Sequence, residues 1–379
     1  MSQSGTTQSE TTASNLRRFK IALLPGDGIG PEVVAPCRVL LDRVAEAVGG
    51  FALDYEEIEA GAALYTRIGE AFPKAAYEAS VKADAMLLGA MGLPDVRGPD
   101  GREVGPQLEL RETLALFAGV RPVRTWPGLR VPLADPRAQA LDFVLIREST
   151  EGLFAGRSTG RVENDSIAQD TLTITRDGCE RLFDFAFALA GQRKAGGKPG
   201  AVTCIDKANV FRSFGFFRKI FDERAEAHPD IEARHMYVDA AALNLVRQPW
   251  EFDVAVTENL FGDILSDLGA GLMGGMGMAP SADIGSEHGL FQPCHGSAPD
   301  IVGQGKANPT ATILSGAMML DWLGRRHDSE ACIEAGRRLT AAVDAAYADG
   351  ALRPFEIGGE AGTEQIARRV AEALEAAGP

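Results

Sequence analysis

Cysteine is scarce in this chain of 379 residues, which contains only five. The five are scattered, and no two form a C-x-x-C pair: Cys37, Cys179, Cys204, Cys294 and Cys332. An odd and dispersed set argues against a disulfide framework and against a cysteine-based zinc site. We therefore expect reduced, mostly buried thiols in a cytoplasmic protein.

Basic residues are also few relative to acidic ones. The chain has 38 Lys and Arg against 53 Asp and Glu, which gives a formal net charge of −15 at pH 7. Proteins that bind nucleic acid or anionic membranes need clustered positive charge to contact phosphates. The balance argues against both partners. If the ligand is a small anion, a local basic cluster or a bound cation must reverse the field at its site.

Long hydrophobic runs are absent as well. No stretch approaches the roughly 18 apolar residues that a membrane-spanning helix needs, so no transmembrane helix is expected. The first 15 residues are polar and have neither the basic nor the apolar region of a secretory signal. We expect residues 1–17 to form a disordered tail.

Apolar runs and helical patterns alternate along most of the chain. Runs suited to buried strands occur at 19–24, 85–88, 143–146, 201–205 and 254–257, and helical patterns at 33–48, 179–190, 210–225 and 313–323. This alternation predicts an α/β fold with a largely parallel sheet and helices on its faces.

The length of 379 residues fits two domains. The chain is irregular near 118–135 and glycine-rich from 269 to 289, with a continuous α/β block between these stretches. We predict one domain from residues 18–117 and 274–379, and an inserted domain of residues 118–273. A segment of alternating character near 155–173 is predicted to form a protruding hairpin arm.

A glycine-rich turn, Pro25-Gly26-Asp27-Gly28-Ile29-Gly30, follows the first predicted strand. Pro31 occupies the last position of the dinucleotide fingerprint G-x-G-x-x-G, so that motif fails, and no Lys-Ser or Lys-Thr follows to complete a P-loop. Pro31 instead suits the start of a helix. Two interpretations stay open, a purely structural tight turn and a turn that lines a site.

Two acidic residues, Asp263 and Asp267, lie four positions apart after the predicted strand 254–257. On a helix this spacing places both carboxylates on one face, about 5–6 Å apart. A third candidate, Asp239, follows a predicted strand at 234–238. Oxygen ligands of this kind favour Mg²⁺ or Mn²⁺ over zinc. On spacing alone, such a pair of aspartates is usually just a solvated helix face.

Several basic residues occupy positions where strands and helices end. Arg147 follows the predicted strand 143–146, and Arg111 and Arg121 flank a helical segment. An arginine at a strand end is well placed to bind a carboxylate through two hydrogen bonds. Lys207 follows the strand 201–205, where a neighbouring metal or arginine cluster would lower its pKa and suit it to act as a general base. Taken singly, each also fits an ordinary surface residue.

A loop of small residues begins at His295 and runs through Gly296, Ser297 and Ala298 to Asp300. Small side chains let a ligand lie close to the backbone. An acidic residue in such a loop accepts hydrogen bonds from a ribose diol and repels a 2′-phosphate.

Together these segments resemble the metal-dependent β-decarboxylating dehydrogenases, the family of the isocitrate and isopropylmalate dehydrogenases. The motifs that carry the resemblance occur in the family's order, at 24–33, 110–122, 206–210, 256–267 and 295–309. The overall pattern is most similar to the isopropylmalate branch. The resemblance implies a two-domain fold with a nucleotide site that is not a Rossmann site, and a homodimer whose active sites share residues between subunits.

The resemblance also implies roles for the residues at the substrate end. Arg111, Arg121 and Arg147 correspond to the clamps for the malate carboxylates, while Gln107, Leu108 and the partner's Val210 line the pocket for the variable substituent. Asp239, Asp263 and Asp267 correspond to the Mg²⁺ or Mn²⁺ ligands, and Lys207 and Asp239 to catalytic residues. By analogy, Lys207 and Asp239 reach the site from the second subunit.

For the nicotinamide cofactor the resemblance implies an extended binding surface in the first domain, while the inserted domain carries substrate and dimer contacts. The residues that the resemblance assigns to this cofactor surface are Ile29, Gly277, His295, Gly296, Ser297, Ala298, Asp300 and Asn308. Asp300 stands in place of a basic residue, which is similar to the enzymes that use NAD.

Two positions depart from the family pattern. Phe154 occupies the place of the tyrosine that normally donates a proton, and loss of a general acid costs about 10²–10⁴-fold in rate. Either another group supplies that proton or decarboxylation is impaired. Gln292 replaces an acidic residue that is common beside the nicotinamide.

The expected activity is NAD-dependent oxidative decarboxylation of a substituted malate. We expect 3-isopropylmalate as substrate, converted to 2-oxoisocaproate in leucine biosynthesis. Gly105 and Gln107 blur the substituent pocket, so isocitrate, homoisocitrate and tartrate stay open as substrates. A catalytically weak regulatory paralogue is the alternative from another class of protein.

Overall fold

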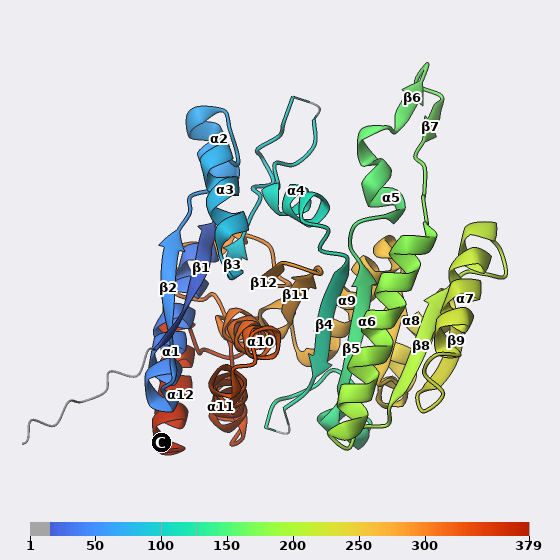
Figure 1. Ribbon diagram of the computed structural model, residues 1–379. Helices are drawn as coiled ribbons and strands as arrows, with labels where there is room; N and C mark the ends of the chain where they lie inside the picture. Colours follow the sequence, from blue (N-terminus) through green and yellow to red (C-terminus); the bar gives the residue numbers. More distant parts are fainter. Residues whose placement is uncertain (1–15, 100, 127, 379) are drawn as a thin grey trace, which may run out of the picture.

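One ten-stranded sheet runs through the whole molecule (Figure 1). The structure is a computed structural model that describes residues 16–99, 101–126 and 128–378. The strands are ordered β2 (Phe51–Glu57), β1 (Arg17–Gly26), β3 (Ala85–Ala90), β12 (Gly289–Pro293), β11 (Pro280–Ile284), β4 (Ala118–Arg124), β5 (Asp142–Glu148), β10 (Val254–Thr257), β8 (Ala201–Asp206) and β9 (Glu232–Tyr237). Residues 1–15 of the predicted tail lie outside the described residues, and Arg17 already belongs to β1.

The sheet is parallel at both ends and antiparallel in the middle. β1 pairs in parallel with β2 and β3, and β10 pairs in parallel with β5 and β8. The central pairs β12–β11, β11–β4 and β4–β5 are antiparallel. The predicted α/β class is therefore confirmed, with a mixed centre that the apolar runs alone did not indicate.

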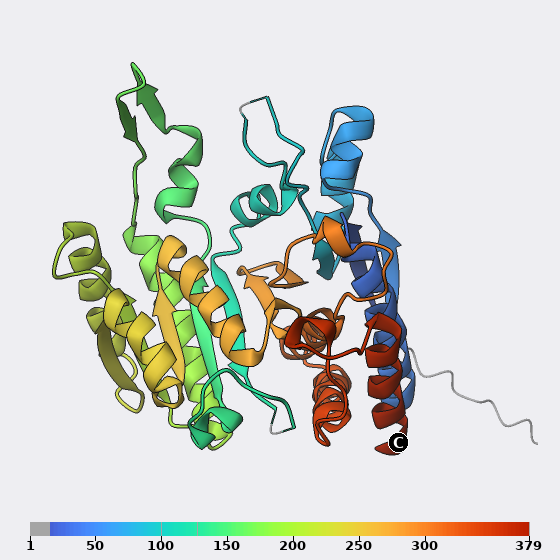
Figure 2. The ribbon, with the colours of Figure 1, turned by 180° about the vertical axis from the view of Figure 1, so that it is seen from behind.

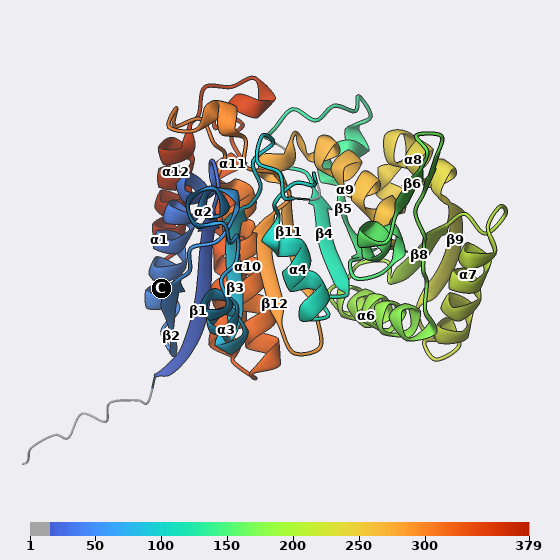
Figure 3. The ribbon, with the colours of Figure 1, turned by 90° about the horizontal axis from the view of Figure 1, so that it is seen from above.

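Helices cover both faces of the sheet (Figures 2 and 3). In the half that contains the strands 201–257, α6 (Arg176–Ala195) and α7 (Arg212–Ala225) lie on one face, and α8 (Val238–Arg247) and α9 (Asn259–Met273) on the other (Figure 3). In the other half, α1 (Gly30–Val48), α10 (Thr310–Arg326), α11 (Glu330–Tyr347) and α12 (Thr363–Ala376) pack together. The short helices α2 (Ala62–Ile68), α3 (Lys74–Lys82) and α4 (Pro106–Thr113) lie at the top of Figure 1.

The segment predicted to form an arm contains a separate hairpin. After α5 (Gly152–Ala155), the strands β6 (Arg161–Glu163) and β7 (Ile167–Gln169) pair antiparallel and extend away from the main sheet (Figure 1). Val162 is 70% exposed and Ile167 51% exposed.

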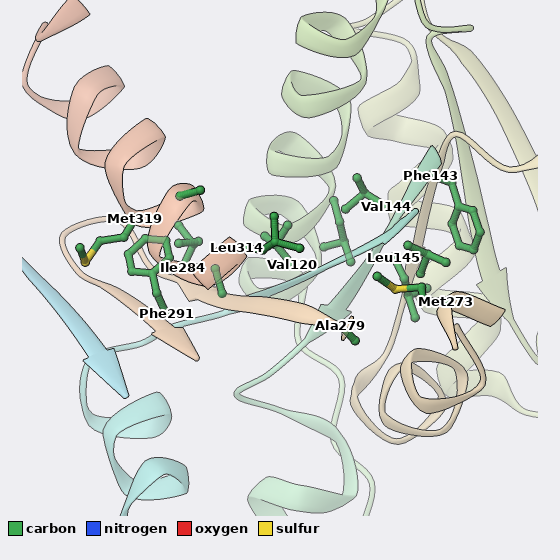
Figure 4. Packing of buried hydrophobic residues seen from close by; sticks show 14 of the residues in the cluster. Val120, Phe143, Val144, Leu145, Met273, Ala279, Ile284, Phe291, Leu314 and Met319 are labelled. Carbon is green, nitrogen blue, oxygen red and sulfur yellow. The ribbon is translucent and has the colours of Figure 1, made fainter. Parts of the chain in front are cut away.

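The two predicted domains share one hydrophobic core. β11 joins β4 through only three residue pairs, yet buried side chains continue across this seam, among them Val120 from the inserted segment and Ile284, Phe291 and Met319 from the rest (Figure 4). The domain boundaries at 117/118 and 273/274 stay a prediction.

Neither a membrane-spanning helix nor a disulfide is found among the described residues. Across 16–99, 101–126 and 128–378, no helix combines the length and apolar character needed to cross a bilayer. The five cysteines all fall within these ranges and are free thiols.

Candidate active site

A cavity of about 190 Å³ is lined by residues of the strands β3, β4, β5, β11 and β12 and of the helices α4 and α9. Its charged lining consists of Arg111, Arg121, Arg147, Asp263 and Asp267. Gln107, Gln292, His295 and Gly296 also line it. Residues that are up to 206 positions apart in the chain, from Ala90 to Gly296, therefore meet in one cavity.

Two of the predicted carboxylate clamps are held by one aspartate that sequence reasoning missed. Asp283, on β11, accepts a hydrogen bond from Arg111 Nε at 2.9 Å and from Arg121 Nη2 at 3.0 Å. Burial by itself would raise the pKa of Asp283, but the Arg111 and Arg121 guanidiniums outweigh that effect and lower it to about 2. Asp283 is thus a permanent anion between two buried cations.

Arg147, at the end of β5, is fixed by α9. Its Nε and Nη2 donate to Asn259 Oδ1 at 3.0 and 2.7 Å, and its Nη1 donates to Asp263. Burial, together with the positive charge of Arg111, lowers the pKa of Arg147 to about 10. The guanidinium therefore stays charged at neutral pH and is available to an anion in the cavity.

Asp263 and Asp267 both face the cavity from α9, as their spacing predicts. The helix begins after Glu258, whose carboxylate accepts from the backbone N–H groups of Leu260 and Phe261. Burial and the nearby Asp263 raise the pKa of Asp267. Two carboxylates that repel each other in this way fit a hard divalent cation between them.

The third predicted metal ligand does not join this pair within one chain. Asp239, near the start of α8, forms an ion pair with Lys207, which follows β8. Neither residue lines the cavity, and no three His, Cys, Asp or Glu side chains converge on a possible metal site anywhere in the described part of the chain. The side chain of Asp239 is 68% exposed, and Val210 is 59% exposed. The predicted site residues thus form two separate groups. One group lines the cavity, and the other, which contains Lys207, Asp239 and Val210, lies outside it.

Of the residues predicted to line the substituent pocket, only Gln107 lines the cavity. Its Oε1 is buried and has no hydrogen-bond partner among the residues that the structure describes. Leu108, the next residue of α4, is partly buried but does not line the cavity. The cavity also has the apolar lining residues Ala90 and Met91, which sequence reasoning did not identify.

The glycine turn packs directly against the loop that begins at His295. The backbone N–H of Ile29 donates to Ser297 O at 2.8 Å, and the Ser297 hydroxyl donates to Gly92 O. Gly28 has φ +58°, and a Cβ there would lie 2.0 Å from Ser297 O, so only glycine fits. The turn and the loop therefore form one continuous surface, and Ala298 takes a left-handed conformation with φ +38° within it.

His295 and Asp300 differ in their surroundings within that loop. The Nδ1 of His295 lies 2.9 Å from Gly296 O, while its Nε2 is buried and has no hydrogen-bond partner in the ranges described. Burial lowers the pKa of His295, so the ring is neutral at pH 7. An unsatisfied buried nitrogen beside the cavity fits a polar group of a bound cofactor. Asp300 is exposed at the outer end of the loop.

Glu356 joins two further predicted cofactor residues. Its carboxylate accepts from Gly277 N at 3.0 Å and from Asn308 Nδ2 at 2.6 Å. Burial raises the pKa of Glu356. Sequence reasoning missed this residue because it lies in a short 3₁₀ segment, Phe355–Ile357, without a recognisable motif.

Comparison with known proteins gives a consistent picture. Residues 20–370 match the family model of isocitrate/isopropylmalate dehydrogenases. The chain is 44% identical over 360 residues to a 3-isopropylmalate/3-methylmalate dehydrogenase of Methanocaldococcus jannaschii, covering 93% of this chain and 99% of the relative. It is 37% identical over 370 residues to the 3-isopropylmalate dehydrogenase of Aquifex aeolicus, with 95% and 98% covered.

The fold agrees with these relatives. The crystal structure of isocitrate dehydrogenase from Methylococcus capsulatus superposes with a TM-score of 0.82 at 36% identity, covering 94% of this chain and 99% of that one. The expectation of an isopropylmalate-dehydrogenase-like fold is thereby confirmed. The chain belongs to the isocitrate/isopropylmalate dehydrogenase family and is a β-decarboxylating dehydrogenase.

Proposed function

We propose that the protein catalyses the NAD-dependent oxidative decarboxylation of a malate with an aliphatic substituent, 3-isopropylmalate being the first candidate and leucine biosynthesis the pathway. One observation carries the proposal: three arginines and two metal-type aspartates line a single cavity beside the apolar residues Ala90 and Met91. The relatives named above that are called 3-isopropylmalate dehydrogenases support the same substrate.

The arginines bind the substrate in this proposal. Arg111 and Arg147 hold the carboxylates by charge-assisted hydrogen bonds, which also orient the carbon that bears the hydroxyl. Asp263, Asp267 and the partner subunit's Asp239 would hold Mg²⁺ or Mn²⁺, which when bound acts as a Lewis acid toward the hydroxyl and the adjacent carboxylate. The partner subunit's Lys207 takes the hydroxyl proton.

The cofactor is bound, in this proposal, by the surface that the glycine turn and the loop after His295 form together. The surface from Ile29 to Ser297 and the pair Gly277 and Asn308 would hold NAD, which accepts the hydride when bound. Asp300, exposed at the end of the loop, would accept hydrogen bonds from the ribose diol and disfavour a 2′-phosphate.

A homodimer completes the site in this proposal. Lys207 and Asp239 lie outside the cavity of their own chain, and apolar residues of the hairpin arm are exposed. We place the reaction in the cytoplasm, which the five free cysteines support.

A second substrate class is favoured by Gln107. Its buried, unpartnered Oε1 lies where the substituent would be, and an amide suits a hydroxyl better than an isopropyl group. Tartrate, which carries such a hydroxyl, is therefore the second candidate.

The test is NADH formation by the purified protein with Mn²⁺ and a panel of 3-isopropylmalate, isocitrate, homoisocitrate, tartrate and malate. We expect 3-isopropylmalate to give the highest kcat/KM. Asp267→Asn is the matched control and should abolish turnover while leaving the fold intact. Absence of turnover on every acid, with ligand binding retained, would contradict the proposal and favour a regulatory role.

A further inference from the structure

Asp283 lies at the centre of the cation cluster and is completely buried. Its Oδ1 accepts from Arg121, and its Oδ2 accepts from Arg111 and, at 2.8 Å, from Gln292 Nε2. Its side chain has no exposed surface. Because both oxygens are occupied by protein donors, Asp283 acts on a ligand through the arginines and does not touch it.

Arg111 and Arg121 differ in how many of their N–H groups are bound by the protein itself. Arg121 Nη1 also donates to Ala282 O at 2.9 Å and to Val120 O at 3.2 Å, so most of its guanidinium is committed to the protein. Arg111 donates through Nε to Asp283, its one acceptor among the residues of the described ranges. Asp283 therefore fixes the planes of both guanidiniums and leaves the terminal nitrogens of Arg111 for a carboxylate in the cavity.

Asp283 also changes the net charge at the cavity. The cavity lining alone has an excess of one positive charge, because it contains three arginines and two aspartates. Asp283, in contact with two of those arginines, cancels that excess. A cation, cofactor or partner residue that completes the site adds the same charge whichever acid is bound, so Asp283 lowers by one the number of substrate carboxylates that the site matches.

Gln292 is suited to this arrangement. Its neutral amide donates to Asp283 inside the cluster. A carboxylate at this position would place a second buried anion against Asp283, at a large cost in a medium of low dielectric constant. The neutral residue at 292 and the anion at 283 therefore belong together.

We propose that Asp283 is a positioning residue that sets the charge class of the substrate, by holding Arg111 and Arg121 and cancelling one positive charge so that dicarboxylates are bound in preference to tricarboxylates. This inference rests on the proposed function, since it specifies the acid that the same cavity takes. Arg111 and Arg147 each offer a guanidinium to one substrate carboxylate, while the charge of Arg121 is already paired with Asp283. A third carboxylate would therefore lack a matching cation in the lining, and such a mismatch disfavours binding strongly.

The first test compares kcat/KM for 3-isopropylmalate and for isocitrate in the wild-type protein and in Asp283→Asn. The change removes one charge and keeps the shape. We expect the ratio of the two values to shift by about tenfold or more toward isocitrate. The matched control is Asp253→Asn, because Asp253 is equally buried and paired with Arg193 but lies away from the cavity. A folded Asp283→Asn protein with an unchanged ratio would overturn the proposal.

The second test does not depend on turnover. Binding of 3-isopropylmalate and of isocitrate to the protein without metal or NAD is measured by calorimetry, and the same shift in preference is expected in Asp283→Asn. If that variant does not fold, Gln292→Glu adds an anion beside Asp283 and should weaken isocitrate binding more than 3-isopropylmalate binding. Equal weakening of both would also overturn the proposal. Failure of the proposed function appears separately, as absence of NADH formation from any acid.

Discussion

The guanidinium carbon of Arg147 lies 4.9 Å from the centre of the Phe154 ring. The ring therefore packs against a group that we assign to the substrate carboxylate, and it presents only carbon there. A cation over an aromatic face is a favourable contact, so Phe154 also helps to hold Arg147 in place. The position where the family carries a proton donor is close to the cavity but cannot supply a proton.

We expect Phe154→Tyr to raise the rate of decarboxylation by about tenfold or more, because no tyrosine from the described residues lines the cavity. The measurement is the ratio of CO₂ released to NADH formed, which should increase in the variant if protonation limits the wild-type reaction. Phe154→Leu is the control, since it removes the ring without adding a hydroxyl. A Tyr variant with unchanged CO₂ and NADH yields would mean that another group already donates the proton.

The proposed sharing of active sites between two subunits leads to a second prediction. Lys207→Ala and Asp263→Asn should each be inactive as homodimers, because each change disables both sites. Co-expression should restore activity to about a quarter of the wild-type value, since half of the dimers are mixed and each mixed dimer has one intact site. Activity is measured in the unfractionated mixture. Mixed dimers isolated through two different tags should show about half of the wild-type activity, because one of their two sites is intact. No recovery in verified mixed dimers would show that each chain supplies its own Lys207.

The lowered pKa of Asp283 predicts an effect on acid stability. Its pKa of about 2 in the folded protein lies below the ordinary value of 3.8. The stabilisation is therefore fully present above about pH 4 and is lost as the pH falls through about 2. This difference corresponds to about 2 kcal/mol in the free energy of unfolding. The stability gap between the wild type and Asp283→Asn should narrow by that amount between pH 4 and pH 2, measured by denaturant titration. A constant gap would contradict the assignment.

Glu356 makes a prediction about the cofactor. Glu356→Ala removes the acceptor shared by Gly277 and Asn308, and loss of these two hydrogen bonds to a carboxylate should weaken NAD binding by about tenfold or more. Fluorescence titration with NAD provides the measurement. Glu360→Ala, a change at a neighbouring acidic residue outside this contact, is the control. Equal affinity for NAD in both variants would show that Asn308 is not part of the cofactor site.

The residues that sequence reasoning identified are those with a local signature. Asp263 and Asp267 are recognisable from their spacing on a helix, and Arg147 from its place after an apolar strand. Asp283 has no such signature, because its role arises from donors on β4, α4 and β12 that the strand pairing brings together. Lys207 and Asp239 illustrate a different limit, since one chain does not bring them to the cavity at all.

The seam between β11 and β4 has a consequence for how the protein unfolds. Three residue pairs are a small connection between the two predicted domains, yet the apolar core continues across it. Domains that share a core lose their packing together, so heat or denaturant should melt the chain as one cooperative unit. We therefore expect the predicted inserted segment, residues 118–273, to unfold together with the rest of the chain.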